Sequence, residues 1–203
     1  MRKCPRLKKT ILQQRKKRFD EIHALVEEIG CTSVVEYEAL SLEERRRRKD
    51  KFWDCLWDWL LDGWAAGLLF VGRDKDIPDL TKILNWVYPR GETTSDIYDR
   101  DITDKEKLQR MIEAEGNRCF NSGVIEAVRG VKGVMKTWET MGDMRVRDSH
   151  FYLEGMTIPF DEEFVTIGGD SAMAPGMFQD AENVVNCRCW ISVFKNGESE
   201  SIS

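Results

Sequence analysis

The chain has 203 residues, of which 41% are hydrophobic and 33% charged, and its net charge is −5. This composition supports a buried core and excludes an intrinsically disordered polymer. The length allows one large domain or two small ones.

The charge is spread unevenly along the chain. Residues 1–50 hold 14 Lys and Arg against 9 Asp and Glu, a balance of +5, whereas the remainder holds 17 against 27, a balance of −10. This asymmetry predicts a basic arm on an acidic body, and such an arm suits nucleic-acid phosphates or an acidic protein surface. The alternative is a solvated, frayed terminus. The candidate nucleic-acid-binding residues are Arg2, Lys3, Arg6, Lys8, Lys9, Arg15, Lys16, Lys17 and Arg18.

Secretion and membrane insertion are not expected. Five of the first nine residues are Lys or Arg, and no uninterrupted apolar region follows them, so we expect no secretory signal. Asp54, Asp58 and Asp62 interrupt the Trp- and Leu-rich residues 52–71, which argues against a membrane span. We therefore expect folding in the cytoplasm, where the six cysteines are reduced or metal-bound rather than linked in a disulfide framework.

The first elements along the chain are predicted to be helices. Residues 5–29 read as a helix that ends at Gly30, and residues 32–40 as a connector. His23, on this first helix, is expected on the surface. A second helix starts at Ser41 with Glu44 as a capping-box partner, and it continues to about residue 70.

One face of the second helix is apolar and aromatic. Spacing at 3.6 residues per turn places the apolar positions together and the three aspartates on a neighbouring face. The simplest interpretation of this stripe is a core, and the alternative is an anchor for a protein partner. Its members are Trp53, Leu56, Trp57, Leu60, Trp64 and Leu68.

The middle of the chain holds a short apolar element over residues 79–88 and a third helix. The third helix begins at Asp104, with Thr103 or Asp104 as its cap, and extends to about Gly116 or past Asn121. Glycines at 130 and 133 then predict a break before Trp138.

The last third is predicted to mix a helix with strands. Residues 137–150 form a further helix, ended by Gly155, in which Asp143 and Arg147 are an i, i+4 pair. Residues 157–160 and 164–167 read as short strands, 168–182 as a loop and 184–194 as the clearest strand. The predicted fold is α+β: a helical N-terminal half over residues 1–90, followed by a compact domain over residues 91–203 with a small, mainly antiparallel sheet.

Two cysteines and a histidine are candidate metal ligands. Cys187 and Cys189 share one face of the predicted last strand, and His150 supplies an imidazole. Zinc accepts mixed sulfur, nitrogen and oxygen ligands, with Asp143, Asp148 or Asp161 as a candidate carboxylate. The cofactor prediction is therefore structural zinc or none, because small buried thiols beside Ile191 and Val193 explain the same pattern.

The residues from 143 to 150 admit two interpretations. In one, His150 is a general acid or base and Arg145 and Arg147 stabilise developing charge, as in a nucleic-acid-cleaving enzyme. In the other, a carboxylate and a guanidinium form a bidentate pair that fastens the following loop to the domain. No nucleophile motif or phosphate-binding glycine loop supports the first, so the second is favoured.

The order of these motifs resembles the phage Mu F-like family of minor head, or head morphogenesis, proteins. The resemblance covers about residues 115–193, where Glu115, Arg118 and Asn121 fit the helix that precedes the motif. The matching residues are W-x-T at 138–140 and D-x-R-V-R-x-x-H at 143–150, then Gly155, Asp161, Phe164 and Pro175, and N-C-R-C at 186–189. The structural motif residues taken from it are Trp138, Asp143, Arg145, Arg147, His150, Gly155, Asn186, Cys187, Arg188 and Cys189.

The resemblance implies a phage or prophage structural protein. Such a protein is a non-enzymatic, low-copy head component that associates with the portal protein, with other head proteins and with packaged or ejected DNA. It is expected in the virion, after assembly in the bacterial host cytoplasm, with no small-molecule substrate. The remaining alternatives are the nucleic-acid-cleaving enzyme and a DNA-binding accessory factor that acts through the basic arm.

Overall fold

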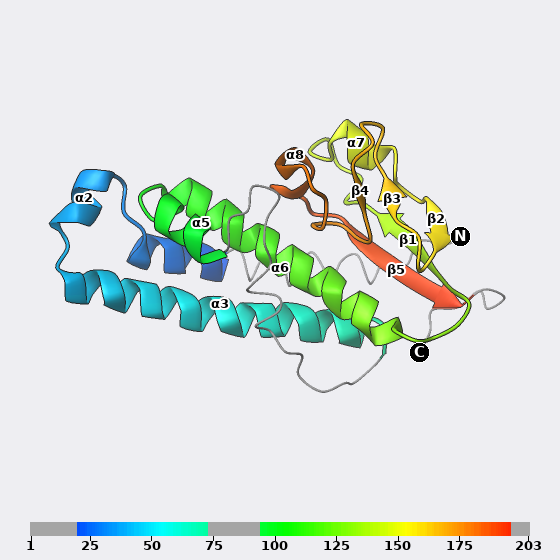
Figure 1. Cartoon of the computed structure of the whole chain (residues 1–203), viewed down its shortest axis with the longest axis horizontal. Helices are drawn as coiled ribbons and strands as arrows, with labels where there is room; N and C mark the ends of the chain where they lie inside the picture. Colours follow the sequence, from blue (N-terminus) through cyan, green and yellow to red (C-terminus); the bar gives the residue numbers. More distant parts are fainter. Residues whose placement is uncertain (1–19, 73–93, 196–203) are drawn as a thin grey trace.

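The computed structural model describes residues 20–72 and 94–195. Helices form its N-terminal half and small antiparallel sheets lie in its C-terminal part (Figure 1), which confirms the α+β prediction. The basic residues 2–18 and the apolar element at 79–88 lie outside the described residues. No helix in the described ranges is long and apolar enough to cross a membrane.

The first described helix covers residues 20–29 and ends at Gly30. Its buried face is apolar, and the Gly30 N–H donates to the carbonyl oxygen of Val26 at 2.9 Å. His23 is exposed, as predicted. The predicted connector is itself mostly helical: α2 spans Val34–Ala39 and is capped by Ser33, whose hydroxyl accepts from the Glu36 N–H.

Helix α3, Leu42–Phe70, begins at the predicted cap. The Ser41 hydroxyl accepts from the Glu44 N–H at 3.1 Å, which satisfies one of the unpaired donors of the first turn. The buried hydrophobic side chains repeat every four residues and are Phe52, Leu56, Leu60, Trp64 and Leu68.

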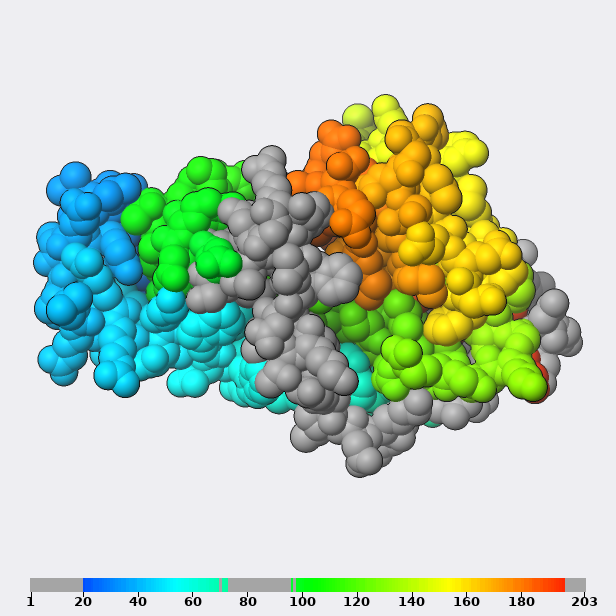
Figure 2. Space-filling view, in the orientation of Figure 1, coloured from blue at the N-terminus to red at the C-terminus, as the bar shows by residue number. Residues whose placement is uncertain are grey.

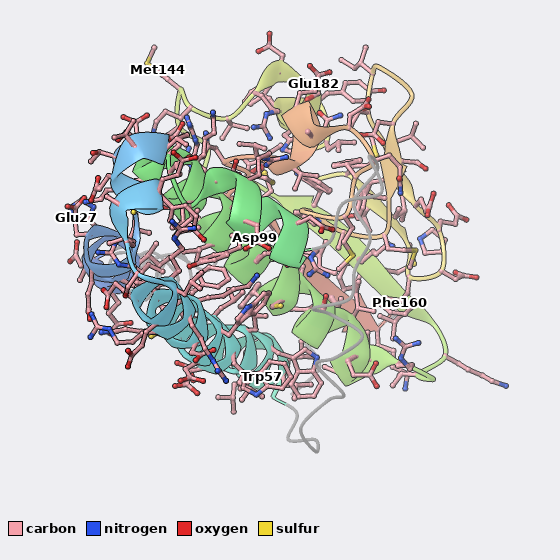
Figure 3. The ribbon with its side chains drawn as sticks, turned by 60° about the vertical axis from the view of Figure 1, so that its left-hand side comes forward. Glu27, Trp57, Asp99, Met144, Phe160 and Glu182 are labelled. Atoms are coloured by element: carbon pink, nitrogen blue, oxygen red, sulfur yellow. The ribbon has the colours of Figure 1, made fainter. Side chains whose placement is uncertain are left out.

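The predicted aromatic stripe on α3 is displaced by one position at its start. Phe52 is fully buried, whereas Trp53 and Trp57 are only half-buried and pack at the margin of the core. Figure 3 shows Trp57 on the outer side of the helix. The predicted polar face is confirmed, because Asp54, Asp58 and Asp62 are all exposed.

Two further helices complete the N-terminal half. Helix α5 spans Thr94–Asp101, and α6 spans Lys105–Val128. The Asp104 carboxylate caps α6 by accepting from the Lys107 N–H at 3.1 Å. The predicted cap is confirmed, and the helix continues past residue 121 to residue 128.

Glycines allow α3 and α6 to lie against each other along their length (Figure 1). A Cβ on Gly67 would meet the Phe120 carbonyl oxygen and would lie 2.9 Å from the Val124 nitrogen. A Cβ on Gly123 would meet the carbonyl oxygen of Trp64. The two backbones are therefore in contact at this crossing, with no room for a larger residue.

The main sheet has three antiparallel strands in the order β2-β1-β5. Strand β1 spans Val134–Glu139, β2 spans Thr157–Pro159 and β5 spans Trp190–Lys195. In this register Trp138 of β1 lies opposite Ile191 of β5. A second, two-stranded sheet pairs β3, Phe164–Val165, with β4, Ser171–Ala172.

Two predictions for this part of the chain are wrong. Residues 137–150 do not form one helix, because residues 134–139 pair with strands on both sides and only α7, Asp148–Phe151, is helical. The last strand begins at Trp190 rather than at 184, since α8, Ala181–Val184, and a loop precede it. The loop turns at Asn186, which adopts a positive φ of 57°. The two short strands predicted at 157–160 and 164–167 are confirmed in part of their lengths.

The buried hydrophobic side chains form two clusters. One lies among the helices, around Phe52, Leu56 and Leu108. The other joins the sheets to the C-terminal part of α3, because Trp64 and Leu68 belong to the same cluster as Trp138. In the face shown in Figure 2, the blue helices lie at one end and the yellow segments around β2 and β3 lie towards the other. The division into domains at residues 90 and 91 stays a prediction.

The helix crossing gives a testable prediction. Gly67→Ala or Gly123→Ala forces the two backbones apart and is expected to lower the free energy of unfolding by about 1–3 kcal/mol. The control is Gly116→Ala, which lies two turns before Gly123 on the same face of α6. A Cβ at Gly116 meets nothing within 4 Å. The unfolding free energy of this control should stay level or rise by up to about 1 kcal/mol. Equal effects of the three substitutions in chemical unfolding would contradict this account.

Candidate functional site

His150 lies at the centre of the motif region and is almost fully buried. It is carried by the short helix α7 and is 1% exposed. Its ring meets the Trp138 ring edge-on at 5.2 Å between centroids and lies 5.5 Å from the Phe178 ring. Packing between two aromatic side chains therefore fixes the orientation of the imidazole.

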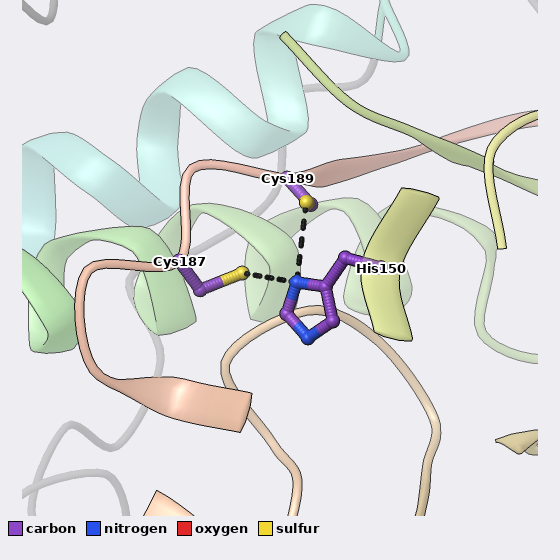
Figure 4. A group of neighbouring side chains, drawn as sticks. All are labelled: His150, Cys187 and Cys189. Carbon is purple, nitrogen blue, oxygen red and sulfur yellow. Dashed lines mark hydrogen bonds between the residues drawn. The ribbon is translucent and has the colours of Figure 1, made fainter. Parts of the chain in front are cut away.

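Two thiols converge on one nitrogen of this imidazole. The Sγ atom of Cys187 lies 3.6 Å from His150 Nδ1, and the Sγ atom of Cys189 lies 3.5 Å from the same atom (Figure 4). Both cysteines are buried and come from the loop that enters β5. The structure thus brings together the three residues that sequence analysis selected as metal ligands.

The surroundings favour the charged form of a thiol at this site. A hydrogen bond with Cys189 is the largest of the effects that hold the pKa of the Cys187 thiol well below its usual range. The interaction with His150 lowers this pKa further, and burial opposes the shift. Such a thiolate is the form that binds metals and reacts as a nucleophile.

None of the three aspartates proposed as a fourth ligand joins this group. Among the described residues, His150, Cys187 and Cys189 form the metal-capable cluster without a carboxylate. Asp148 and Asp161 are exposed. Asp143 is engaged elsewhere, so the prediction of an aspartate ligand is wrong for the described structure.

Asp143 instead forms a bidentate ion pair with Arg188. The two guanidinium nitrogens lie 2.8 Å and 2.5 Å from its carboxylate oxygens. The pair fastens the loop after β1 to the loop before β5, as the second interpretation of the motif requires, but with a different arginine. The Arg188 guanidinium lowers the pKa of the Asp143 carboxyl to about 2.

The two arginines of the D-x-R-V-R motif have different surroundings. Arg147 donates to the backbone carbonyl of Asn183 at 3.3 Å and to that of Val185. Arg145 is exposed and lies 3.9 Å from Asp143. The predicted helical pairing of Asp143 with Arg147 is wrong, because residues 140–147 form a loop. Figure 3 shows Met144 of this loop at the outer edge of the molecule.

A small cavity lies against the thiols and the imidazole. All three of these side chains line it, together with Arg145, Val146, Arg147, Asn186, Arg188 and Met141. Three arginines therefore border the approach to the buried group; Arg188 is paired with Asp143, and Arg147 is bonded to backbone carbonyls.

Asn121 of α6 links the helix to the motif, a role that sequence analysis did not assign. Its amide oxygen accepts from the Ile191 N–H at 3.0 Å, and its amide nitrogen donates to the carbonyls of Pro175 at 3.2 Å and Cys189 at 3.4 Å. The side chain is fully buried. One turn earlier, Glu115 and Arg118 form a buried ion pair on the same helix.

Asp170 is a second organising residue that sequence analysis missed. Its carboxylate accepts from the Gln179 and Asp180 N–H groups at 3.1 Å each, and from the Asn183 side chain at 2.9 Å. Asn183 in turn accepts from the Ser149 hydroxyl at 3.0 Å. The signal available was an aspartate directly after two glycines, a combination that favours turns closed by side chains.

The remaining motif residues complete β1 and its following turn. Trp138 is fully buried, and its carbonyl accepts from the N–H of Gly155, which has a positive φ of 75°. The Thr140 N–H donates to the Glu154 carboxylate at 2.6 Å, and the Thr140 hydroxyl accepts from the Gly142 N–H. The W-x-T motif and Gly155 therefore hold the strand and turn that present His150.

Comparison with known proteins finds a family and partial relatives. Residues 81–192 match the family described as phage Mu protein F like protein. The chain is similar to the minor head protein GP7 of Bacillus phage SPP1, with 33% identity over 99 residues, 47% of this chain and 32% of that protein. No solved structure matches the chain.

A shorter similarity links the chain to NAD(+)--arginine ADP-ribosyltransferase EFV of Enterococcus faecalis (strain ATCC 700802 / V583). It has 45% identity over 56 residues, which are 28% of this chain and 11% of that protein. The chain thus spans about a third or less of the length of these two relatives.

The Asp143–Arg188 pair predicts a pH-dependent contribution to stability. Because the pKa of the folded carboxyl is about 2 and its usual value is 3.8, the contribution is present above about pH 4 and is lost as the pH falls towards 2. Asp143→Asn should lower the unfolding free energy at neutral pH by about 0.5–1 kcal/mol, a small value because both side chains are partly exposed. Asp58→Asn on the exposed face of α3 is the control. If the difference in unfolding free energy between the wild type and Asp143→Asn is the same at pH 2 as at neutral pH, the pairing is contradicted.

The Asn121 amide predicts a larger effect. Asn121→Ala leaves the buried Ile191 N–H and the Pro175 carbonyl without their partner, and should lower the unfolding free energy by about 2–3 kcal/mol. Ser122→Ala is the matched control. Within the described residues its hydroxyl bonds to the Arg118 carbonyl of the same helix, and its loss should cost less than about 1 kcal/mol. Similar losses for both variants in chemical unfolding would show that Asn121 does not carry the link.

Proposed function

The chain belongs to the family of phage Mu protein F-like proteins, and from this premise we propose that it is a minor head protein that acts in the assembly of a phage or prophage head. The observation that carries the proposal is the family match over residues 81–192, which runs through the whole motif region. The similarity to the minor head protein GP7 supports the same role. The resemblance drawn from the motif residues is confirmed by this match.

The arrangement of the motif supports a structural role over catalysis. The imidazole that a nuclease would use is 1% exposed and faces two thiols. Arg147 is bonded to backbone carbonyls of α8 and the following loop. These contacts stabilise the folded loops of the motif region. The proposal is therefore a non-enzymatic protein, and the ADP-ribosyltransferase activity in the name of the shorter match remains a property of that relative.

The proposed partners are the portal protein, other head proteins and DNA. The location of such a protein is the virion, after assembly in the bacterial host. DNA contact is assigned to the nine basic residues between Arg2 and Arg18, because a cluster of Lys and Arg binds phosphates by releasing counterions.

Co-purification tests this proposal. The full chain, tagged and co-expressed with the portal protein and the major capsid protein of the same phage genome, should be recovered with portal and with assembled heads. A variant in which the nine basic residues between Arg2 and Arg18 are replaced by Gln is the matched control. It should keep the portal association and lose DNA affinity, which in the wild type should fall steeply with salt.

Two results would count against the proposal. A chain that is never recovered with portal or heads, although it is folded and expressed, would remove the head-protein role. Cleavage of DNA or RNA by the purified chain, abolished by His150→Ala, would instead favour the enzyme.

A further inference from the structure

We propose that His150, Cys187 and Cys189 bind one zinc ion through Nδ1 and the two Sγ atoms, with a fourth coordination position open to the arginine-lined cavity. This inference goes beyond the role in the phage head and does not depend on it. It rests on the geometry of the three side chains.

The distances between the ligand atoms match those of a tetrahedral zinc site. With Zn–S of about 2.3 Å and Zn–N of about 2.0–2.1 Å, a tetrahedral angle places sulfur and nitrogen about 3.5–3.6 Å apart. The two S–N distances in the protein are 3.6 Å and 3.5 Å. All three ligand atoms lie within 4.8 Å of one another. The three atoms therefore surround a position that a zinc ion can occupy.

Hydrogen bonding alone explains this convergence poorly. A histidine Nδ1 carries either one hydrogen or one lone pair, so it makes one directed bond. Two sulfur atoms at nearly equal distance from it exceed that capacity. A cation shared by all three atoms accounts for both short distances at once.

The fold holds the ligands in place before any ion binds. The His150 ring is fixed between Trp138 and Phe178. The Cys187 N–H donates to the Val184 carbonyl at 3.1 Å, and the Cys189 carbonyl accepts from Asn121. Because both thiols are already ordered, little conformational entropy remains to be lost on binding.

The spacing of the cysteines is unusual but explained by the turn before them. Structural zinc sites commonly separate two cysteines by two to four residues, whereas Arg188 alone lies between these two. The positive φ of Asn186 bends the loop, and the ion pair of Arg188 with Asp143 holds the intervening side chain away from the thiols. Both thiols can then face the same imidazole.

The fourth position is assigned to a ligand from the cavity. In the parts of the chain that the structure describes, no fourth histidine, cysteine or carboxylate belongs to the group. The cavity touches all three ligands and is bordered by Arg145, Arg147 and Arg188. Three protein ligands and an exchangeable fourth are typical of open zinc sites, and the arginines favour water or a small anion in that place.

Metal content is the direct test. Full-length chain purified without chelator should contain close to one zinc per chain. Cys187→Ser, Cys189→Ser and His150→Asn should each reduce the content to less than about a tenth of that. Cys55→Ser is the matched control, because this half-buried thiol lies on α3 outside the group, and it should leave the zinc content unchanged. Wild-type protein without zinc, even after addition of zinc to the reduced chain, would overturn the proposal.

Cobalt substitution tests the ligands in the wild-type chain, independently of the folding of any variant. The wild-type chain loaded with Co²⁺ should show tetrahedral d–d bands and a thiolate-to-cobalt charge-transfer band. Chloride, which is close to water in size, should change the d–d bands by exchange at the fourth position. An octahedral spectrum, or one without thiolate charge transfer, would contradict the proposed three-residue site. Bands that do not change at saturating anion would contradict the open fourth position. Loss of the zinc proposal would leave portal association intact, so the two failures can be told apart.

Discussion

The contact between His150 and the two thiols closes a long excursion of the chain, and the arrangement of the motif region depends on this closure. The histidine is 37 residues from Cys187 and 39 from Cys189 in sequence. Closing a loop of this length costs on the order of 3 kcal/mol in chain entropy. One buried contact between an imidazole and thiols would offset this cost poorly, so the closure needs further support.

That support comes from polar contacts arranged around the site. The Asp143–Arg188 pair joins the two ends of the excursion at the surface, and Asp170 organises the middle of it. Asn121 connects the returning chain to α6, and the close helix crossing at Gly67 holds α6 against α3. The excursion is thereby held against the helical half, and the sheet and helices share one apolar cluster. Zinc at the three ligands would add a direct link between its ends.

Local signals in the sequence predicted the helical half well. Ser41 and Asp104 act as caps where the pattern placed them, because an N-cap is decided by a few neighbouring residues. The grouping of His150 with the two cysteines was also predictable, since these residue types share a ligand chemistry. The α+β class followed from the short strands predicted at 157–160, 164–167 and 184–194 after a helical N-terminal half.

Several errors in the motif region concern contacts between distant segments. Residues 137–139 were assigned to a helix because the pairing of β1 with β2 and β5 is not visible in local spacing. The partner of Asp143 is an arginine 45 residues away rather than one four residues away. Asn121 and Asp170 are ordinary polar residues in the sequence, and only the folded chain shows which backbone groups they satisfy.

Native-state hydrogen exchange measures the central claim, that the closed excursion and α6 form one cooperative unit. The amides to follow are those of His150 and Cys187, which bond within the excursion, and of Ile191, which bonds to Asn121. If the unit is cooperative, these amides open with one free energy and one denaturant dependence, shared with the interior of α6. If the His150 and Cys187 amides exchange at much lower free energy while Ile191 and α6 stay protected, the excursion is an independent loop and the account is wrong.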